Sequence, residues 1–245
     1  MQKNRSHLIF ILPNLFTAAS AFMGVLSIIS SSKGNFEKAV YFILLSLIFD
    51  GLDGRVARMT KATSKFGAEF DSLADLVAFG VAPAMLFYFD IGYRYGKVGS
   101  LLSALFVLFG AIRLARFNVT SPKDEPSVFI GVPIPTAAVF VSIWILFSLK
   151  YHISSSIFDG LILFFMGLVS ILMVSNIRYP SFKKIDLKRA NLKKALIAII
   201  ILFSFIYLYL VESIAIIFTV YILYGVIRGY RNFLKRKKIA KNDKI

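Results

Sequence analysis

The chain has 245 residues, of which 58% are hydrophobic, and it carries a formal net charge of +16. Its long apolar runs exclude an ordinary soluble domain of this length and predict an integral membrane protein. The absence of cysteine excludes disulfides and thiolate metal sites.

Eight apolar segments follow one another along the chain, each near the ~20 residues that a helix needs to cross about 30 Å of hydrocarbon. The first begins after a short basic stretch and is long enough to span, so we expect a retained helix rather than a cleaved signal. The last two are separated only by Glu212 and Ser213. The sequence therefore predicts an all-α fold, a polytopic membrane bundle of about eight transmembrane helices over residues 8–30, 36–57, 71–90, 98–117, 133–150, 157–176, 194–211 and 213–231.

We interpret residues 1–245 as a single membrane domain with three parts. A catalytic six-helix core is expected up to about residue 176. Two additional helices follow over about 194–231, and a basic tail occupies 232–245.

The basic residues are distributed unevenly between the two sides of this predicted bundle. With eight crossings, one side receives both termini and 24 of the 29 Lys and Arg residues. Cytoplasmic loops of membrane proteins are enriched in Lys and Arg, so we expect both termini to be cytoplasmic and the protein to lie in the inner cell membrane. The basic loops and tail suit anionic membrane lipids, and no nucleic-acid partner is expected.

Five of the thirteen acidic residues gather between Phe49 and Gly80. Asp50 and Asp53 are three residues apart, and Asp71 and Asp75 are four apart, so each pair shares one helix face. The short polar stretch MTKATSK lies between the two predicted helices. The sequence therefore predicts that these four carboxylates meet near the cytoplasmic membrane surface.

Four adjacent carboxylates stay ionised only beside a compensating cation. A basic partner is one candidate, but the nearby Arg55 and Arg58 are too few to neutralise the cluster. Mg²⁺ or Mn²⁺ held by carboxylate oxygens is favoured, and such an ion can also bind phosphate oxygens. Three glycines in the same stretch allow the backbone to approach a ligand closely, namely Gly51, Gly54 and Gly67.

The spacing of this stretch resembles the signature of the CDP-alcohol phosphatidyltransferases, without a departure, in the pattern Asp50-x2-Asp53-Gly54-x2-Ala57-Arg58-x8-Gly67-x3-Asp71-x3-Asp75. The resemblance implies a membrane enzyme with its active site facing the cytoplasm. In this family a hydroxyl attacks the lipid-side phosphorus of a CDP-linked lipid such as CDP-diacylglycerol, and CMP leaves. It also implies two bound divalent ions, and a homodimer is consistent with it.

The resemblance implies roles for individual residues. Asp75 corresponds to the general base and also lies among the metal ligands, which are Asp50, Asp53, Asp71 and Asp75. The positions that bind the CDP-lipid in the family correspond here to Asn14, Thr17, Gly54, Ala57, Arg58, Ser64 and Gly67.

The predicted fourth helix ends in FGAIRLARFNVT, which places Arg113 and Arg116 on one face, with Asn118 close by. The arginines could simply extend toward the membrane surface. The planar guanidinium also suits a carboxylate or phosphate, so this group of three residues predicts an acceptor that carries an anion. L-serine and glycerol 3-phosphate both satisfy this condition.

Three stretches favour L-serine, because they resemble the membrane-embedded, serine-using members of the same family: DSLADLVAFGVAPA, RLARFN and GVPIPTAA. A CDP-linked ether lipid in place of CDP-diacylglycerol stays open as a donor. A transporter with an acidic site is the alternative from another class. Transport sites usually lie near the bilayer midplane, often within repeats, whereas these acidic residues are predicted at helix ends.

Overall fold

The computed structural model describes residues 2–60, 64–120, 128–180, 204–205 and 207–242. Within these ranges the chain is almost entirely helical, in agreement with the all-α prediction. The elements are α1 (Gln2–Ser32), α2 (Phe36–Met59), α3 (Lys65–Asp75), the π-helix η1 (Leu76–Val81), α4 (Ala82–Asp90), the 3₁₀-helix η2 (Gly92–Tyr95), α5 (Gly96–Thr120), β1 (Val128–Ile130), α6 (Ile134–Lys150), α7 (Ser156–Val174), β2 (Arg178–Pro180) and α9 (Leu210–Asn242).

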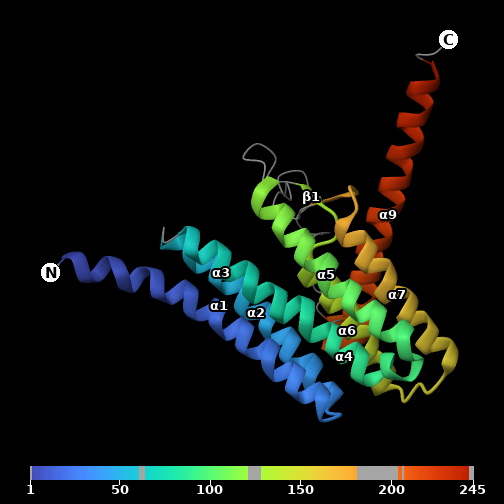
Figure 1. Cartoon of the computed structure of the whole chain (residues 1–245), viewed down its shortest axis with the longest axis horizontal. Coiled ribbons are helices and arrows are strands. Elements are labelled where there is room, and N and C mark those ends of the chain that lie inside the picture. The colour runs from blue at the N-terminus through green and yellow to red at the C-terminus, as the bar shows by residue number, and fades with distance from the viewer. Residues whose placement is uncertain (1, 61–63, 121–127, 181–203, 206, 243–245) are drawn as a thin grey trace.

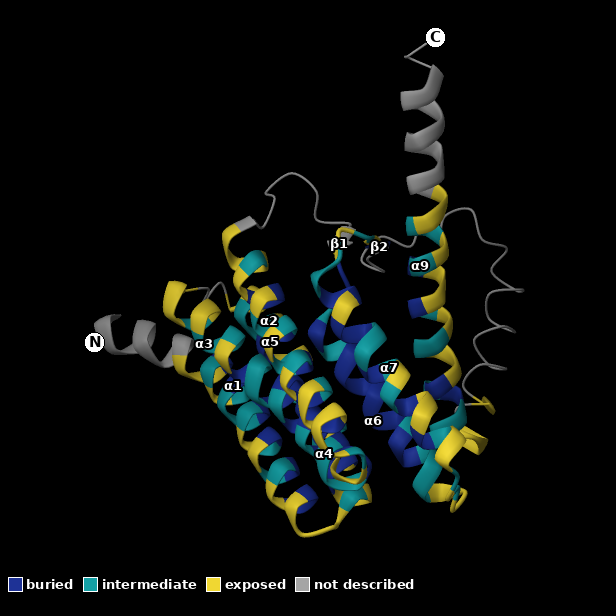
Figure 2. Ribbon diagram, turned by 45° about the vertical axis from the view of Figure 1, so that its right-hand side comes forward, coloured by how far each residue is buried: buried dark blue, intermediate teal, exposed yellow. Residues whose placement is uncertain are grey.

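The long helices run alternately up and down, so the connections gather at two ends of the bundle (Figures 1 and 2). The turns at 33–35, 91–95 and 151–155 lie at one end, which we call the distal end. The α2–α3 connection and the antiparallel pair β1–β2 lie at the other end. Arg116, near the end of α5, contacts the carbonyl groups at the end of α7, so the ends of these helices also meet there.

Five helical stretches are long and apolar enough to cross a membrane, at residues 11–32, 65–90, 92–119, 156–174 and 210–231. The predicted spans at 36–57 and 133–150 are also helices, as α2 and α6. However, α2 carries charged residues in its first turn and in its last third, and α6 has only 17 residues. The structure therefore confirms a helical membrane protein, while the number eight stays a prediction.

The third predicted span starts at residue 71, but its helix begins earlier, because Lys65–Phe70 is also helical. The Ser64 hydroxyl accepts a hydrogen bond from the Gly67 backbone N–H (2.9 Å) and so caps the N-terminus of α3. The helix then passes through η1 into α4 and ends at Asp90. Asp71 and Asp75 therefore lie within a helix that begins before the predicted span, and Asp71 is not at its start.

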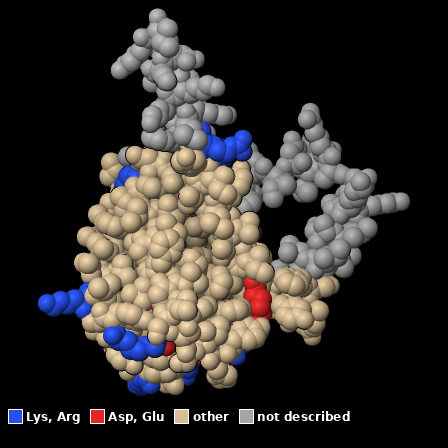
Figure 3. All heavy atoms as spheres, turned by 90° about the vertical axis from the view of Figure 1, so that its right-hand side faces the viewer, with Lys and Arg blue, Asp and Glu red and all other residues tan. Residues whose placement is uncertain are grey.

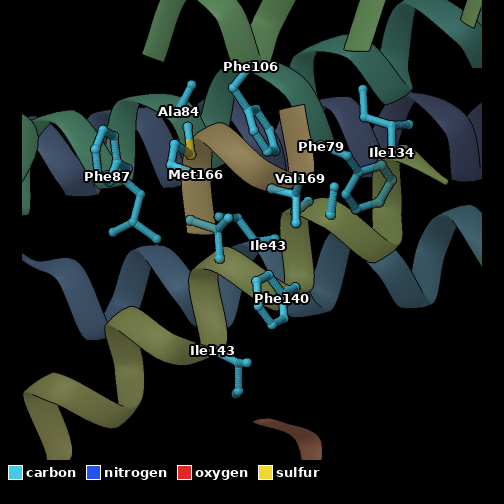
Figure 4. Packing of buried hydrophobic residues seen from close by; sticks show 14 of the residues in the cluster. Ile43, Phe79, Ala84, Phe87, Phe106, Ile134, Phe140, Ile143, Met166 and Val169 are labelled. Atoms are coloured by element: carbon cyan, nitrogen blue, oxygen red, sulfur yellow. The ribbon is translucent and has the colours of Figure 1, made fainter. Parts of the chain in front are cut away.

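Helix α6 forms the centre of the core. Nine of its residues between Ala137 and Leu146 are buried, whereas the surrounding helices bury only one face. Figure 4 shows Phe140 and Ile143 of α6 packed among side chains from the neighbouring helices, including Ile43, Phe79, Phe106 and Met166. The outer surface seen from the α7 and α9 side is mostly uncharged (Figure 3), as expected for a surface that faces lipid.

Helices α1 and α2 approach closely because small residues line their contact. A Cβ at Gly24 would lie 2.7 Å from Cα of Ala78 in η1, so this position of α1 has room only for glycine. The hydroxyls of Ser20 and Ser46 are 2.7 Å apart, and Ser27 donates to the Ala39 carbonyl at 2.9 Å. These buried contacts fix α1, α2 and η1 relative to one another, as small and hydroxyl residues commonly do in membranes.

The predicted seventh span, 194–211, lies mainly outside the described residues. The expected break at Glu212 and Ser213 is wrong, because α9 begins at Leu210 and includes both residues in its first turns. These two polar residues of the helix make tertiary contacts and do not mark its end. Glu212 binds Lys150 and Tyr151 at the end of α6, and Ser213 donates to the Phe205 carbonyl.

Candidate active site

The last turns of α2 and the first turns of α3 bring the four motif aspartates together. Ligand oxygens of Asp50, Asp53 and Asp71 all lie within 4.8 Å of one another. Asp75, one turn after Asp71, has its carboxyl group within hydrogen-bonding reach of Asp50. The predicted meeting of the two helix faces is thus present, and we call these four residues the acidic quartet.

The acidic quartet is only partly exposed to solvent. Asp53 is 6% exposed, and the other three side chains are intermediate. The buried Thr17 of α1 donates a hydrogen bond to Oδ2 of Asp53 (2.8 Å), with the Pro13 carbonyl as a second acceptor at 3.2 Å. One hydroxyl cannot compensate several mutually repelling carboxylates, so the quartet presents an excess of negative charge.

A pocket opens beside the acidic quartet, between α1, α2 and the start of α3. Its wall contains all seven residues that the sequence predicts to bind the CDP-lipid, together with two of the quartet: Asn14, Thr17, Asp53, Gly54, Ala57, Arg58, Ser64, Gly67 and Asp71. Pro13 and Ala68 complete it.

Two glycines shape this pocket. A Cβ at Gly67 would lie 3.1 Å from Ser64 Oγ and 3.3 Å from Asn14 Oδ1, so glycine lets α3 approach α1. A Cβ at Gly54 would lie 3.3 Å from Nη1 of Arg58, whose guanidinium folds back over this position. Gly51 differs from both, because it is exposed and a Cβ there would meet nothing within 4 Å.

Arg113 of α5 supplies a buried positive charge next to the acidic quartet. Arg113 is 7% exposed, and its guanidinium interacts electrostatically with Asp75. It also lies over the ring of Phe117, at 5.8 Å from the ring centroid. Nε of Arg113 has no hydrogen-bond partner among the described residues. The structure therefore places a donor group next to the predicted general base.

Arg116 and Asn118 contact other groups of this chain. The Arg116 guanidinium donates to the carbonyls of Met173, Val174 and Ser175 at the end of α7, and to Ile130 of β1. It therefore acts as a C-terminal cap for α7, where a cation is favourable. Asn118 is exposed, and its amide donates to Ser72 and Glu69. The acceptor role of Arg116 and Asn118 therefore stays a prediction, and of the three residues Arg113 is the one that interacts with Asp75.

Comparison with known proteins agrees with this arrangement. Residues 10–172 match the family model described as CDP-alcohol phosphatidyltransferase. The chain belongs to the CDP-alcohol phosphatidyltransferase family. The matched region runs from the pocket-lining α1 to the end of α7 and includes the acidic quartet.

Three relatives within this family bear names that include serine. A CDP-diacylglycerol–serine O-phosphatidyltransferase of Helicobacter pylori is 50% identical over 236 residues, which cover 96% of this chain and 97% of that protein. An archaetidylserine synthase of Methanothermobacter thermautotrophicus is 41% identical over 69% of each chain. A CDP-diacylglycerol–serine O-phosphatidyltransferase of Bacillus subtilis is 37% identical over 71% of this chain and 92% of its own length.

The carboxylates fit the divalent cation that the family resemblance implies. Oxygen ligands from three aspartates suit a hard ion such as Mg²⁺ or Mn²⁺, and the local excess of negative charge needs a cation. Asp50, Asp53 and Asp71 would hold such an ion. The set of three does not include Asp75, which lies between Asp50 and Arg113.

Sequence reasoning did not identify two tyrosines beside Arg113. Tyr221 of α9 interacts electrostatically with the Arg113 guanidinium, and Tyr179 of β2 packs against Tyr221 with ring centroids 5.5 Å apart. Both lie beyond the matched region, more than 60 residues after Arg113 in the sequence. No local motif marks them, so only the packing of α9 and β2 could reveal them.

Proposed function

We propose that this chain transfers the phosphatidyl group of CDP-diacylglycerol to the hydroxyl group of L-serine, giving phosphatidylserine and CMP. The observation that carries this proposal is 50% identity to a serine O-phosphatidyltransferase over nearly the whole of both chains. The buried Arg113 beside Asp75 supports it independently, because serine carries a carboxylate near its hydroxyl group.

In this mechanism the CDP head group occupies the pocket between α1, α2 and the start of α3. Asn14, Thr17 and Ser64 provide polar contacts, and the glycines let the head group approach the backbone. Arg58 binds the diphosphate. The acyl chains extend sideways into the bilayer. This geometry fixes the phosphorus near the acidic quartet, and such positioning supplies much of the catalysis in phosphoryl transfer.

Asp75 accepts the proton of the serine hydroxyl group as its oxygen forms a bond to the diacylglycerol-bearing phosphorus. The bond between this phosphorus and the bridging oxygen breaks, and its electron pair leaves with CMP. Arg113 orients serine through its carboxylate, and Arg58 compensates charge on the departing phosphate. Asp50, Asp53 and Asp71 would hold Mg²⁺ or Mn²⁺, two ions by resemblance to the family, and these ions would supply further charge compensation to the phosphate oxygens.

We also propose eight transmembrane helices with both termini and the acidic quartet on the cytoplasmic side. The uneven distribution of Lys and Arg supports this orientation. The absence of native cysteine permits a direct test with single-cysteine variants. A membrane-impermeant maleimide should label Thr60→Cys only in inside-out vesicles and Ser154→Cys only in right-side-out vesicles.

The function is tested by CMP release from CDP-diacylglycerol with serine or glycerol 3-phosphate as acceptor, and with the corresponding CDP-linked ether lipid as donor. We expect release with serine and a lipid product that contains it. Product formation with glycerol 3-phosphate but not with serine would refute the assignment of L-serine as the acceptor. Activity with the CDP-linked ether lipid but not with CDP-diacylglycerol would refute the assignment of CDP-diacylglycerol as the donor.

A further inference from the structure

Arg113 of α5 and Tyr179 of β2 each bury a polar group. Arg113 is 7% exposed and Tyr179 is completely buried. Nε of Arg113 and the hydroxyl of Tyr179 have no hydrogen-bond partner among the described residues. Two buried polar groups without partners are costly in a folded protein, and such groups commonly mark a ligand site.

Tyr221 connects these two groups. Its ring centroid is 5.5 Å from that of Tyr179, and it interacts electrostatically with Arg113. Arg113 in turn interacts with Asp75 of the acidic quartet. The four side chains therefore form a continuous series from the predicted general base to α9.

Glycine residues of α9 leave room for β2 and the residue before it. A Cβ at Gly225 would clash with the ring of Tyr179, and a Cβ at Gly229 would lie 2.9 Å from Cγ1 of Ile177. These glycines are four residues apart, so they form one groove on the face of α9 that receives β2. The fit shows that α9, which lies beyond the region matched to the family, takes part in a specific arrangement next to Arg113.

We infer that Arg113, Tyr179 and Tyr221 form the subsite that binds the carboxylate of the acceptor, an inference that rests on the proposed serine transferase function. A guanidinium and phenol hydroxyls all donate hydrogen bonds, which is the set that a carboxylate needs. Serine is short enough for its carboxylate to contact this subsite while its hydroxyl faces Asp75. Helix α9 and β2 thereby contribute to acceptor specificity.

The test uses Tyr179→Phe and Tyr221→Phe in the full chain, with CMP release measured against L-serine and L-serine methyl ester. The change to phenylalanine retains the ring and removes only the hydroxyl. The matched control is Tyr224→Phe, an exposed tyrosine of the same helix. Thermal unfolding is measured in parallel, because a purely structural hydroxyl would change stability and leave the Michaelis constants unaltered.

We expect each variant to raise the KM for serine about ten-fold, as for the loss of a hydrogen bond to a charged group. The KM for CDP-diacylglycerol and for the methyl ester should be unchanged, because neither presents a carboxylate to the subsite. The control should match the wild type for both acceptors.

An unchanged KM for serine in both variants would overturn the inference. If Tyr179→Phe does not fold, Tyr221→Phe decides the matter by the same criterion. A wild-type protein that releases no CMP with serine would instead overturn the proposed function. The two failures are therefore distinguishable.

Discussion

The two ends of the helical bundle differ in how their carboxylates are paired with basic side chains. At the distal end, Asp159 is 6% exposed and forms an ion pair with Arg94 at 2.9 Å. Glu212 pairs there with Lys150 at 2.6 Å. At the other end, the acidic quartet gathers four carboxylates, and Arg113 is the buried arginine described beside them.

This difference separates structural charges from charges available for function. Asp159 and Glu212 are each paired with a basic side chain of the same chain. The acidic quartet is not compensated in this way, and its repulsion would favour protonation unless a cation or ligand binds. We therefore expect substitutions at the distal end to change stability, and substitutions in the acidic quartet to change chemistry.

The largest effect should follow from Asp75→Asn. Loss of the general base should lower kcat by about 10²- to 10⁴-fold. The thermal unfolding temperature should not fall, because the change removes one repelling carboxylate. The matched control is Asp159→Asn, which should unfold at a lower temperature and keep its kcat while folded. The comparison would be refuted if Asp75→Asn kept its kcat and unfolded at a lower temperature, while Asp159→Asn lost kcat and kept its stability.

Removal of divalent ions should have the next largest effect. A chelator should reduce CMP release to background, and Mg²⁺ or Mn²⁺ should restore it, because phosphate oxygens would lose their compensating charge. The ion should also raise the unfolding temperature of the wild type, as a ligand that binds only the folded state does. Full activity in the presence of excess chelator would contradict this expectation.

Arg113→Lys should sharpen the comparison on the acceptor side. Lysine keeps the charge beside Asp75 but loses the planar pair of donors. We expect a roughly ten- to hundred-fold rise in the KM for serine, as for a lost hydrogen bond to a charged group, with little change in the KM for CDP-diacylglycerol. An equal rise for both substrates would mean that Arg113 only maintains the fold.

Arg116→Gln should have the smallest effect on activity, although it lies one turn from Arg113. It removes the cation that caps the end of α7, so we expect a loss of about 1–2 kcal/mol in unfolding free energy. The KM for serine should stay within about two-fold of the wild type. Loss of a hydrogen bond to the acceptor would raise this KM by more than that. A large and selective rise in this KM would restore Arg116 to the acceptor site.

The sequence predicted the helices and the meeting of the acidic quartet because both depend on local spacing. Apolar runs define helix length, and aspartates three or four residues apart share a face. The start of α3 was missed because the capping by Ser64 depends on a single hydroxyl within a polar stretch. The contacts of Arg116 and the position of Tyr179 depend on β2, α7 and α9, which local sequence does not relate to α5. Tertiary packing therefore decided which polar residues face the site.

Binding of Mn²⁺ to the purified protein, measured by electron paramagnetic resonance, tests the central claim most directly. We predict that the wild type and Asp159→Asn bind Mn²⁺ equally well, and that Asp53→Asn and Asp71→Asn bind it much more weakly. If Asp53→Asn and Asp71→Asn retained wild-type affinity, the acidic quartet would not be the metal site and the account would be contradicted.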